Sequence, residues 1–233
     1  MGLLSGKAVI ITGAGGGLGA ATAHRLAAEG ASLGLLDLNE ANAAATAKAV
    51  NDGGGKAVAR GADVADQKNY AEACRSVVKE LGRLDGIVSS AIWIKYDPVQ
   101  DVTQEIVDRS FGVGITAVLW AAQIAVEHMQ SGGALVNFSS PAATVGFMNT
   151  SVYTCTKGAI ASLTRQLAVE LGPRGIRSNA IAPGPTPTPG SNAVINEEGW
   201  KKRLARGSRS RTTSPTRRST WCRTSAATST AWW

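Results

Sequence analysis

Tyr153 and Lys157 are the residues of this sequence whose types and spacing most directly suggest proton chemistry. They are four positions apart in a segment of helical periodicity, so their side chains would lie on one face of a helix. A phenol is a poor base at neutral pH, but a lysine cation beside it favours the phenolate. This spacing is common by chance on helix surfaces, so a catalytic interpretation needs further residues.

Ser140 provides the first of these. It lies 13 residues before Tyr153 and directly after an apolar run, 134–139, that predicts a strand. Open α/β sheets bind ligands at the carboxyl ends of their parallel strands. We therefore expect Ser139 and Ser140 beside a ligand crevice, near the helix that carries Tyr153.

A glycine-rich turn over residues 12–19 follows the first predicted strand and opens the first predicted helix. Its sequence is Thr-Gly-Ala-Gly-Gly-Gly-Leu-Gly. Glycines in such a turn let the backbone approach a pyrophosphate closely, and the free amides of the helix N-terminus favour the anion. A glycine cluster by itself is equally typical of a simple tight turn.

Asp37 strengthens the nucleotide interpretation of this turn. It ends the second predicted strand, 18 residues after Gly19, where a carboxylate can accept hydrogen bonds from an adenosine ribose and repel a 2′-phosphate. Alternatively, Asp37 is a solvated residue at a strand end or a cap for the helix at Glu40. Asp63, after the third strand, could contact an adenine or cap the next helix.

The elements that must position these residues alternate between short apolar runs and longer helical segments, as in βαβ units. The predicted strands are 7–11, 32–37, 56–60, 86–90, 134–139 and 176–182, and the predicted helices are 18–29, 40–52, 67–81, 103–130 and 152–171. The sequence therefore predicts a single doubly wound, Rossmann-type α/β domain over residues 1–190. Residues 191–233, which are rich in Ser, Thr and Arg, are expected to form an irregular, disordered basic tail.

The net charge of +7 is concentrated in that tail. Residues 201–233 hold nine basic and no acidic residues, which leaves 15 basic against 17 acidic residues in the first 200. We therefore expect no nucleic-acid partner. We also expect no membrane partner, because no apolar run approaches the roughly 18 residues that span a bilayer. Three cysteines without paired spacing favour a reducing, cytoplasmic location and predict neither a disulfide framework nor a metal site.

Taken together, these motifs resemble the short-chain dehydrogenase/reductase family over residues 5 to about 188. The matching residues are Thr12, Gly13, Gly17, Gly19, Asp37, Asp63, Val64, Ser140, Tyr153, Lys157, Arg177, Asn179, Ile181, Pro183, Gly184 and Thr188. The resemblance implies six parallel strands in the order 3-2-1-4-5-6. It also implies an oxidoreductase that moves a hydride between NAD(H) and a small alcohol or ketone.

The same resemblance assigns roles to individual residues. Tyr153 would be the catalytic acid/base, Ser140 would hydrogen-bond the substrate oxygen, and Lys157 would bind the nicotinamide ribose and keep the tyrosine acidic. The implied cofactor-binding residues are Thr12, Gly13, Gly17, Leu18, Gly19, Asp37, Asp63, Val64, Ala91, Tyr153, Lys157, Pro183, Gly184 and Thr188. Pro183, Gly184 and Thr188 would border the nicotinamide, and Asp37 implies NAD rather than NADP.

Two positions depart from the family pattern. Residues 89–92 read Ser-Ser-Ala-Ile where the family usually has an Asn-Asn-Ala-Gly-like turn. Gly114 aligns with an asparagine that anchors a proton-relay water near the lysine, and a glycine side chain cannot hold that water. The alternative function is therefore a catalytically impaired module that binds NAD but lacks a complete relay and substrate lid.

The tail lacks the lid, final helix and final strand that the family usually has. If residues from Arg211 onward are written as codons with suitable third bases, skipping two nucleotides gives Asp-Asp-Ile-Ala-Asp-Ala-Ala-Val-Tyr-Leu-Val-Ser, which looks like that helix and strand. We therefore expect a shift of reading frame near residues 200–210, with a natural disordered tail as the alternative. The family tendency to form homo-oligomers would then be compromised, and the sixth strand would be left as an edge.

Overall fold

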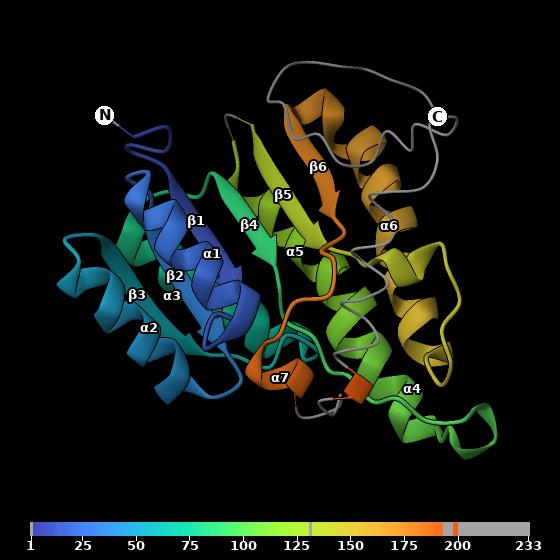
Figure 1. Cartoon of the computed structure of the whole chain (residues 1–233). Helices are drawn as coiled ribbons and strands as arrows, with labels where there is room; N and C mark the ends of the chain where they lie inside the picture. The colour runs from blue at the N-terminus through green and yellow to red at the C-terminus, as the bar shows by residue number, and fades with distance from the viewer. Residues whose placement is uncertain (1, 131, 193–197, 200–233) are drawn as a thin grey trace, which may run out of the picture.

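A computed structural model describes residues 2–130, 132–192 and 198–199. Its centre is one sheet of six parallel strands in the order β3-β2-β1-β4-β5-β6 (Figure 1). The strands are β1 (Ala8–Thr12), β2 (Ser32–Asp37), β3 (Lys56–Gly61), β4 (Gly86–Ser89), β5 (Gly133–Phe138) and β6 (Ile176–Ile181). The doubly wound fold and strand order predicted from the sequence are confirmed, with strand ends within one residue of those expected.

Helices cover both faces of the sheet. The front face in Figure 1 carries α1 (Gly17–Ala28) and α2 (Glu40–Asp52), and the opposite face carries α3 (Gln67–Leu81), α5 (Ala117–His128) and α6 (Ser151–Leu171). Alternate residues of one strand enter the two cores, for example Ile11 on the α1 side and Ile10 on the α3 side. Because both faces are covered, the central strands are buried along nearly their whole length.

The segment expected as one helix over 103–130 is divided in the structure. It comprises α4 (Gln104–Phe111), a π-helical segment η2 (Gly112–Thr116) and α5. Gly112 and Gly114 lie in that segment, and π-turns inside helices occur frequently at functional sites. Counted together, residues 104–128 form a helix long and apolar enough to cross a membrane, contrary to our expectation, but half of its most apolar window is buried inside the protein, as in a core helix.

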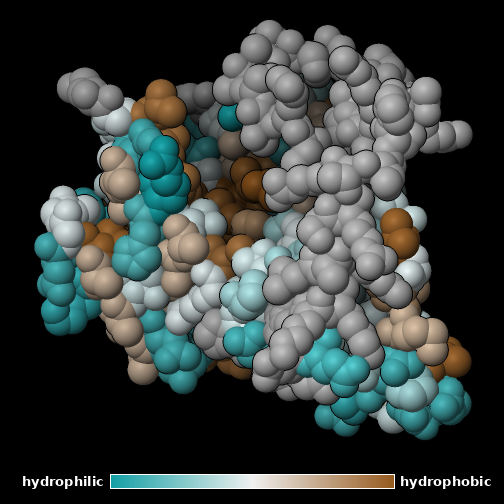
Figure 2. All heavy atoms as spheres, in the orientation of Figure 1, coloured by the Kyte–Doolittle hydropathy of each residue, from teal (hydrophilic) through white to brown (hydrophobic). Residues whose placement is uncertain are grey.

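The described part of the sheet ends at β6, and its front face is less covered there. On β5, Val136 and Phe138 are only half-buried, and Ile181 at the end of β6 is exposed. Figure 2 shows apolar side chains gathered between α1 and β6, over β4 and β5. This arrangement agrees with the expectation that β6 is an edge strand. The residues expected to form the irregular basic tail lie outside the described residues, except 191, 192, 198 and 199, and so does the whole region expected to follow the frame shift.

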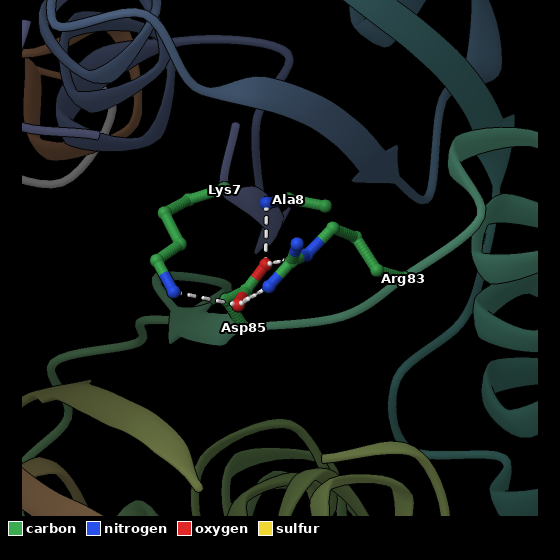
Figure 3. Close-up of polar contacts among 4 residues, drawn as sticks. All are labelled: Lys7, Ala8, Arg83 and Asp85. Atoms are coloured by element: carbon green, nitrogen blue, oxygen red, sulfur yellow. Dashed lines mark hydrogen bonds and ion pairs between the residues drawn. The ribbon is translucent and has the colours of Figure 1, made fainter. Parts of the chain in front are cut away.

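An ion-pair cluster joins β1 to the start of β4 at the opposite end of the sheet from the strand carboxyl ends. The two oxygens of Asp85 accept hydrogen bonds from the Ala8 amide at 2.9 Å, from Arg83 at 2.6 and 2.7 Å and from Lys7 at 3.2 Å (Figure 3). Burial alone would raise the pKa of Asp85, but the Arg83, Ala8 and Lys7 donors outweigh it and lower that pKa. The cluster fixes the neighbouring strands in register away from the site.

A short helix, α7 (Pro189–Asn192), lies where the sequence predicts irregular chain, across the expected domain boundary at 190. Thr188 caps it, because its side-chain oxygen accepts a hydrogen bond from the Ser191 amide at 3.2 Å. The signal was present in the sequence, since a threonine followed by a proline is typical of a helix start. The run of prolines over 183–189 obscured it.

Candidate active site

The glycine turn forms a cradle at the carboxyl end of β1. Gly13 and Gly17 adopt φ values of 64° and 53°, which disfavour side chains. A Cβ on Gly13 would lie 2.8 Å from the Ala91 backbone, and one on Gly19 would overlap the Gly13 carbonyl. Helix α1 begins at Gly17, and no side chain caps its first amides. These open amides and the absence of side chains fit a dinucleotide pyrophosphate.

Asp37 faces this turn from the end of β2. One carboxylate oxygen accepts a hydrogen bond from the Gly15 amide at 2.9 Å, and the other accepts one from the Asn39 amide at 3.0 Å. The helix-capping alternative for Asp37 is wrong, because Asn39 is the N-cap of α2. The carboxylate therefore lies against the phosphate cradle, where a ribose hydroxyl would be expected.

Asp63 is held by a partner that the sequence did not indicate. Arg109, from α4, donates a hydrogen bond to its carboxylate at 2.8 Å, and the Ala65 amide donates another at 3.0 Å. Burial would raise the pKa of Asp63, but the Arg109 and Ala65 hydrogen bonds outweigh it and lower that pKa. Asp66, not Asp63, caps α3. Asp63 and the buried Val64 thus lie just after the end of β3, at the same edge of the sheet as the cradle.

The turn after β4 is tied to β1 through Thr12. The Thr12 hydroxyl accepts hydrogen bonds from the Ser90 and Ala91 amides, each at 3.2 Å. This arrangement keeps the turn in place although Ser89 and Ser90 replace the asparagines usual in the family, and it brings Ala91 against Gly13. The turn is therefore formed by backbone donors that do not depend on the substituted side chains.

Tyr153 and Lys157 lie together at the start of α6, as their spacing predicts. The Lys157 ammonium is 5.8 Å from the centre of the Tyr153 ring and donates a hydrogen bond to the Phe138 carbonyl at 2.6 Å. Ser139 donates to the Lys157 carbonyl at 2.9 Å, which ties α6 to the end of β5. Lys157 is only 4% exposed, and burial lowers its pKa to about 8. The lysine thus remains a cation at neutral pH in dry surroundings.

Ser140 follows β5 at the same edge of the sheet. It is half-buried, and its hydroxyl accepts a hydrogen bond from the Ala142 amide at 3.2 Å at the start of η3 (Pro141–Ala143). The hydroxyl can still donate its own hydrogen, which is what binding a substrate oxygen requires. Since η3 packs against α6, Ser140 and Tyr153 belong to one rigid corner of the fold.

Tyr96 is a site residue that sequence reasoning missed. Its ring meets the Tyr153 ring edge to face, with the centroids 5.5 Å apart and the planes at 85°. An aromatic residue shortly after the end of β4 could have indicated it, because loops at that edge surround the ligand. The contact fixes one side of the phenol that we expect to react.

The segment after β6 packs against the glycine turn. Thr188 lies against Gly17, so that a Cβ on that glycine would be 3.2 Å from the Thr188 Cβ. Pro183 and Gly184 lie between the end of β6 and this contact. The structure therefore places Thr188 against the glycine turn, and its expected contact with the nicotinamide stays a prediction. Among the described residues no three His, Cys, Asp or Glu side chains are grouped as a metal site.

Comparison with known proteins identifies the family of this chain. The family model for short chain dehydrogenases matches residues 7–199. The chain belongs to the short-chain dehydrogenase family. It is 37% identical over 195 residues to an uncharacterized oxidoreductase of Methylorubrum extorquens, covering 83% of this chain and 79% of that protein. It is therefore an oxidoreductase.

Two further relatives show the range of this dehydrogenase family. A cyclopentanol dehydrogenase of a Comamonas species is 32% identical over 198 residues, covering 84% of this chain and 79% of its own. A short chain dehydrogenase from Burkholderia cenocepacia, solved in complex with NADP, is 35% identical with a TM-score of 0.77, covering 80% of this chain and 77% of that one. Binding of a nicotinamide cofactor is thus a property of the family, and it agrees with the cradle described above.

Proposed function

We propose that this dehydrogenase uses NAD(H) to interconvert a small-molecule alcohol and its carbonyl compound, with Tyr153 as the acid/base. The observation that carries the proposal is the Tyr153 phenol beside a buried lysine, at the same edge of the sheet as a cradle that fits a dinucleotide. The activity named for the Comamonas relative, an alcohol dehydrogenase, supports the same class of substrate.

The roles of the residues follow from their positions. When bound, the nicotinamide supplies or accepts the hydride at the substrate carbon. Tyr153 gives its proton to the carbonyl oxygen in reduction and takes it from the hydroxyl in oxidation. The Lys157 cation stabilises the phenolate left behind, and its effect is strong because the surroundings exclude water. Ser140 donates a hydrogen bond that holds the substrate oxygen near the phenol.

The preference for NAD over NADP rests on Asp37. Its carboxylate lies against the glycine turn, and the next residue is the exposed Leu38 rather than an arginine that could pair with a phosphate. A 2′-phosphate within a few ångströms of Asp37 would lose on the order of a few kcal/mol at an effective dielectric constant of about 20. This charge repulsion favours NAD by about a hundredfold.

The test is the variant Tyr153→Phe, assayed by NADH absorbance on a panel of alcohols and ketones. We expect turnover to fall at least a hundredfold while NADH binding, followed by fluorescence, stays within threefold. Tyr70→Phe is the matched control, because it removes the hydroxyl of a fully buried tyrosine in the core. Unchanged turnover in Tyr153→Phe would exclude the acid/base role, and NADH binding without turnover in the unmodified chain would favour the binding-module alternative.

A further inference from the structure

The segment between the catalytic serine and the catalytic helix carries no charge. No acidic or basic residue occurs between Ser140 and Lys157. Within this stretch, residues 145–148 expose Val145, Phe147 and Met148, and Met148 is 87% exposed. The Thr150 hydroxyl donates to the Phe147 carbonyl at 2.9 Å, so this apolar stretch is tied to the first turn of α6. It therefore lies close in the chain and in space to Tyr153.

One aromatic residue of the loop after β4 contacts Tyr153. Tyr96 packs edge to face on its ring, and Trp93, in the same loop, packs against the hydrophobic core. Edge-to-face contacts hold rings in defined orientations, and such rings pack well against further aromatic or apolar groups. Tyr96 can thus position the reacting phenol and contact a substrate at the same time.

The two charged residues that flank Tyr96 in the chain pair with each other. Lys95 and Asp97 form an ion pair with 3.4 Å between nitrogen and oxygen. The Lys157 ammonium already donates a hydrogen bond to the Phe138 carbonyl, and its charge acts on the Tyr153 phenol. A carboxylate or phosphate on a substrate that contacts Tyr153 and Tyr96 would therefore lose water without gaining an ion-pair partner from Lys95 or Lys157, and burial of an unpaired charge is costly.

We propose that the substrate is an uncharged alcohol or ketone with a bulky apolar group, which contacts Tyr96 and residues 145–148. This inference rests on the proposed function and specifies the substrate class of the same site. Tyr96 is assigned as a specificity and positioning residue, and Ser140 and Tyr153 act on the oxygen at the polar end. The class excludes keto acids, sugar phosphates and very small ketones as good substrates.

The test compares two ligands that differ by one group. In 4-phenyl-2-butanone a methyl group lies where 2-oxo-4-phenylbutanoate has a carboxylate, and acetone removes the bulk. Binding is measured by calorimetric titration of the Tyr153→Phe variant with NADH present, so that it does not depend on turnover. We expect the neutral phenyl ketone to bind at least tenfold more tightly than either comparison ligand. Equal or tighter binding of the keto acid, or of acetone, overturns the inference.

Added charge provides a second, independent readout. Met148→Arg places a cation on the exposed apolar stretch and should reduce the preference for the neutral ketone about tenfold by strengthening keto-acid binding. Val169→Arg is the matched control: it adds the same charge at another exposed position of the protein, roughly 24 Å along α6 from Tyr153, and should leave the preference unchanged. No change in Met148→Arg would show that residues 145–148 do not contact the ligand.

The role of Tyr96 is tested by Tyr96→Ala and Tyr96→Phe. We expect Tyr96→Ala to lower kcat/KM for the phenyl ketone about tenfold and Tyr96→Phe to restore it, because the ring makes the contact. A merely structural role would change acetone and phenyl ketone turnover equally. A failure of the proposed function can be distinguished from a failure of this inference. It would appear as no turnover of any carbonyl compound by the unmodified chain, whereas the order of binding affinities can still be measured.

Discussion

Thr156 occupies the space that a side chain at position 114 would need. A Cβ built on Gly114 would overlap Thr156 Cγ2, with Ile160 behind it at 3.9 Å. Thr156 cannot readily turn away, because it is 1% exposed and its hydroxyl donates to the Val152 carbonyl at 2.8 Å. Gly114 therefore packs against the turn of α6 between Tyr153 and Lys157. The volumes of Gly114 and Thr156 are therefore complementary in this contact.

We expect Gly114→Asn alone to be destabilising by about 1–3 kcal/mol, because it overpacks this contact, and to give no gain in turnover. The single variant therefore does not test by itself whether a relay side chain at position 114 would raise turnover. Gly114→Asn combined with Thr156→Ser removes the obstructing methyl and keeps the hydroxyl, so it should recover most of the lost stability. Thermal unfolding and NADH turnover of the three variants, with Thr156→Ser as control, check this. Equal stability of Gly114→Asn and the unmodified chain would contradict it.

Sequence patterns predicted the elements and the edge of the sheet where the site lies, because both follow from local periodicity and from the order of βαβ units. Tyr153 and Lys157 were found for the same reason, since helix spacing is local. The contacts of Tyr96 with Tyr153, Arg109 with Asp63 and Thr156 with Gly114 were not predicted, because each joins segments at least 40 residues apart. Which side chains meet across such distances depends on packing volumes that no spacing rule supplies.

We expect Lys157→Met to stabilise the fold while abolishing turnover. Burial lowers the pKa of Lys157 to about 8 from its ordinary value near 10.5. Between pH 8 and pH 10.5 the unfolded chain therefore binds this proton more strongly than the folded chain does. Stability of the unmodified protein should therefore rise from pH 8 to pH 10, and at pH 7 the buried cation costs up to about 3 kcal/mol.

Denaturant unfolding at pH 7, 8, 9 and 10 measures this effect. Lys157→Met should be more stable at pH 7 and should lack the rise above pH 8. The exposed Lys48→Met variant is the control and should follow the unmodified profile. A Lys157→Met variant that is less stable at pH 7 would show that the hydrogen bond to the Phe138 carbonyl outweighs the cost of burying the charge.

Asp85→Asn should cost about 1–3 kcal/mol of stability at pH 7, because three donors would lose their charged acceptor and β1 its link to β4. The pKa of Asp85 is lowered in the folded protein, so this stabilisation is present above about pH 4, the unfolded value, and is lost as the pH falls below it. Thermal unfolding at pH 7 and pH 3 checks both points. Asp52→Asn, at an exposed ion pair, should change stability by no more than about 0.5 kcal/mol, and an equal loss there would contradict the argument.

Asp37→Asn tests cofactor choice while preserving the turn. The asparagine side-chain oxygen can still accept the hydrogen bond from the Gly15 amide, so the glycine turn should keep its shape, while the negative charge and the hydrogen bond from the Asn39 amide are lost. We expect the preference for NAD over NADP in binding titrations to fall from about a hundredfold to below about tenfold, mainly through tighter NADP binding.

Adding Leu38→Arg at the exposed neighbouring position should reverse the preference, because a guanidinium pairs with a 2′-phosphate. The charge effect should also weaken in high salt, since exposed charges are screened. Equal binding of both cofactors by the unmodified chain would mean that Asp37 does not face the ribose, and its bond to Gly15 would then serve only to hold the turn.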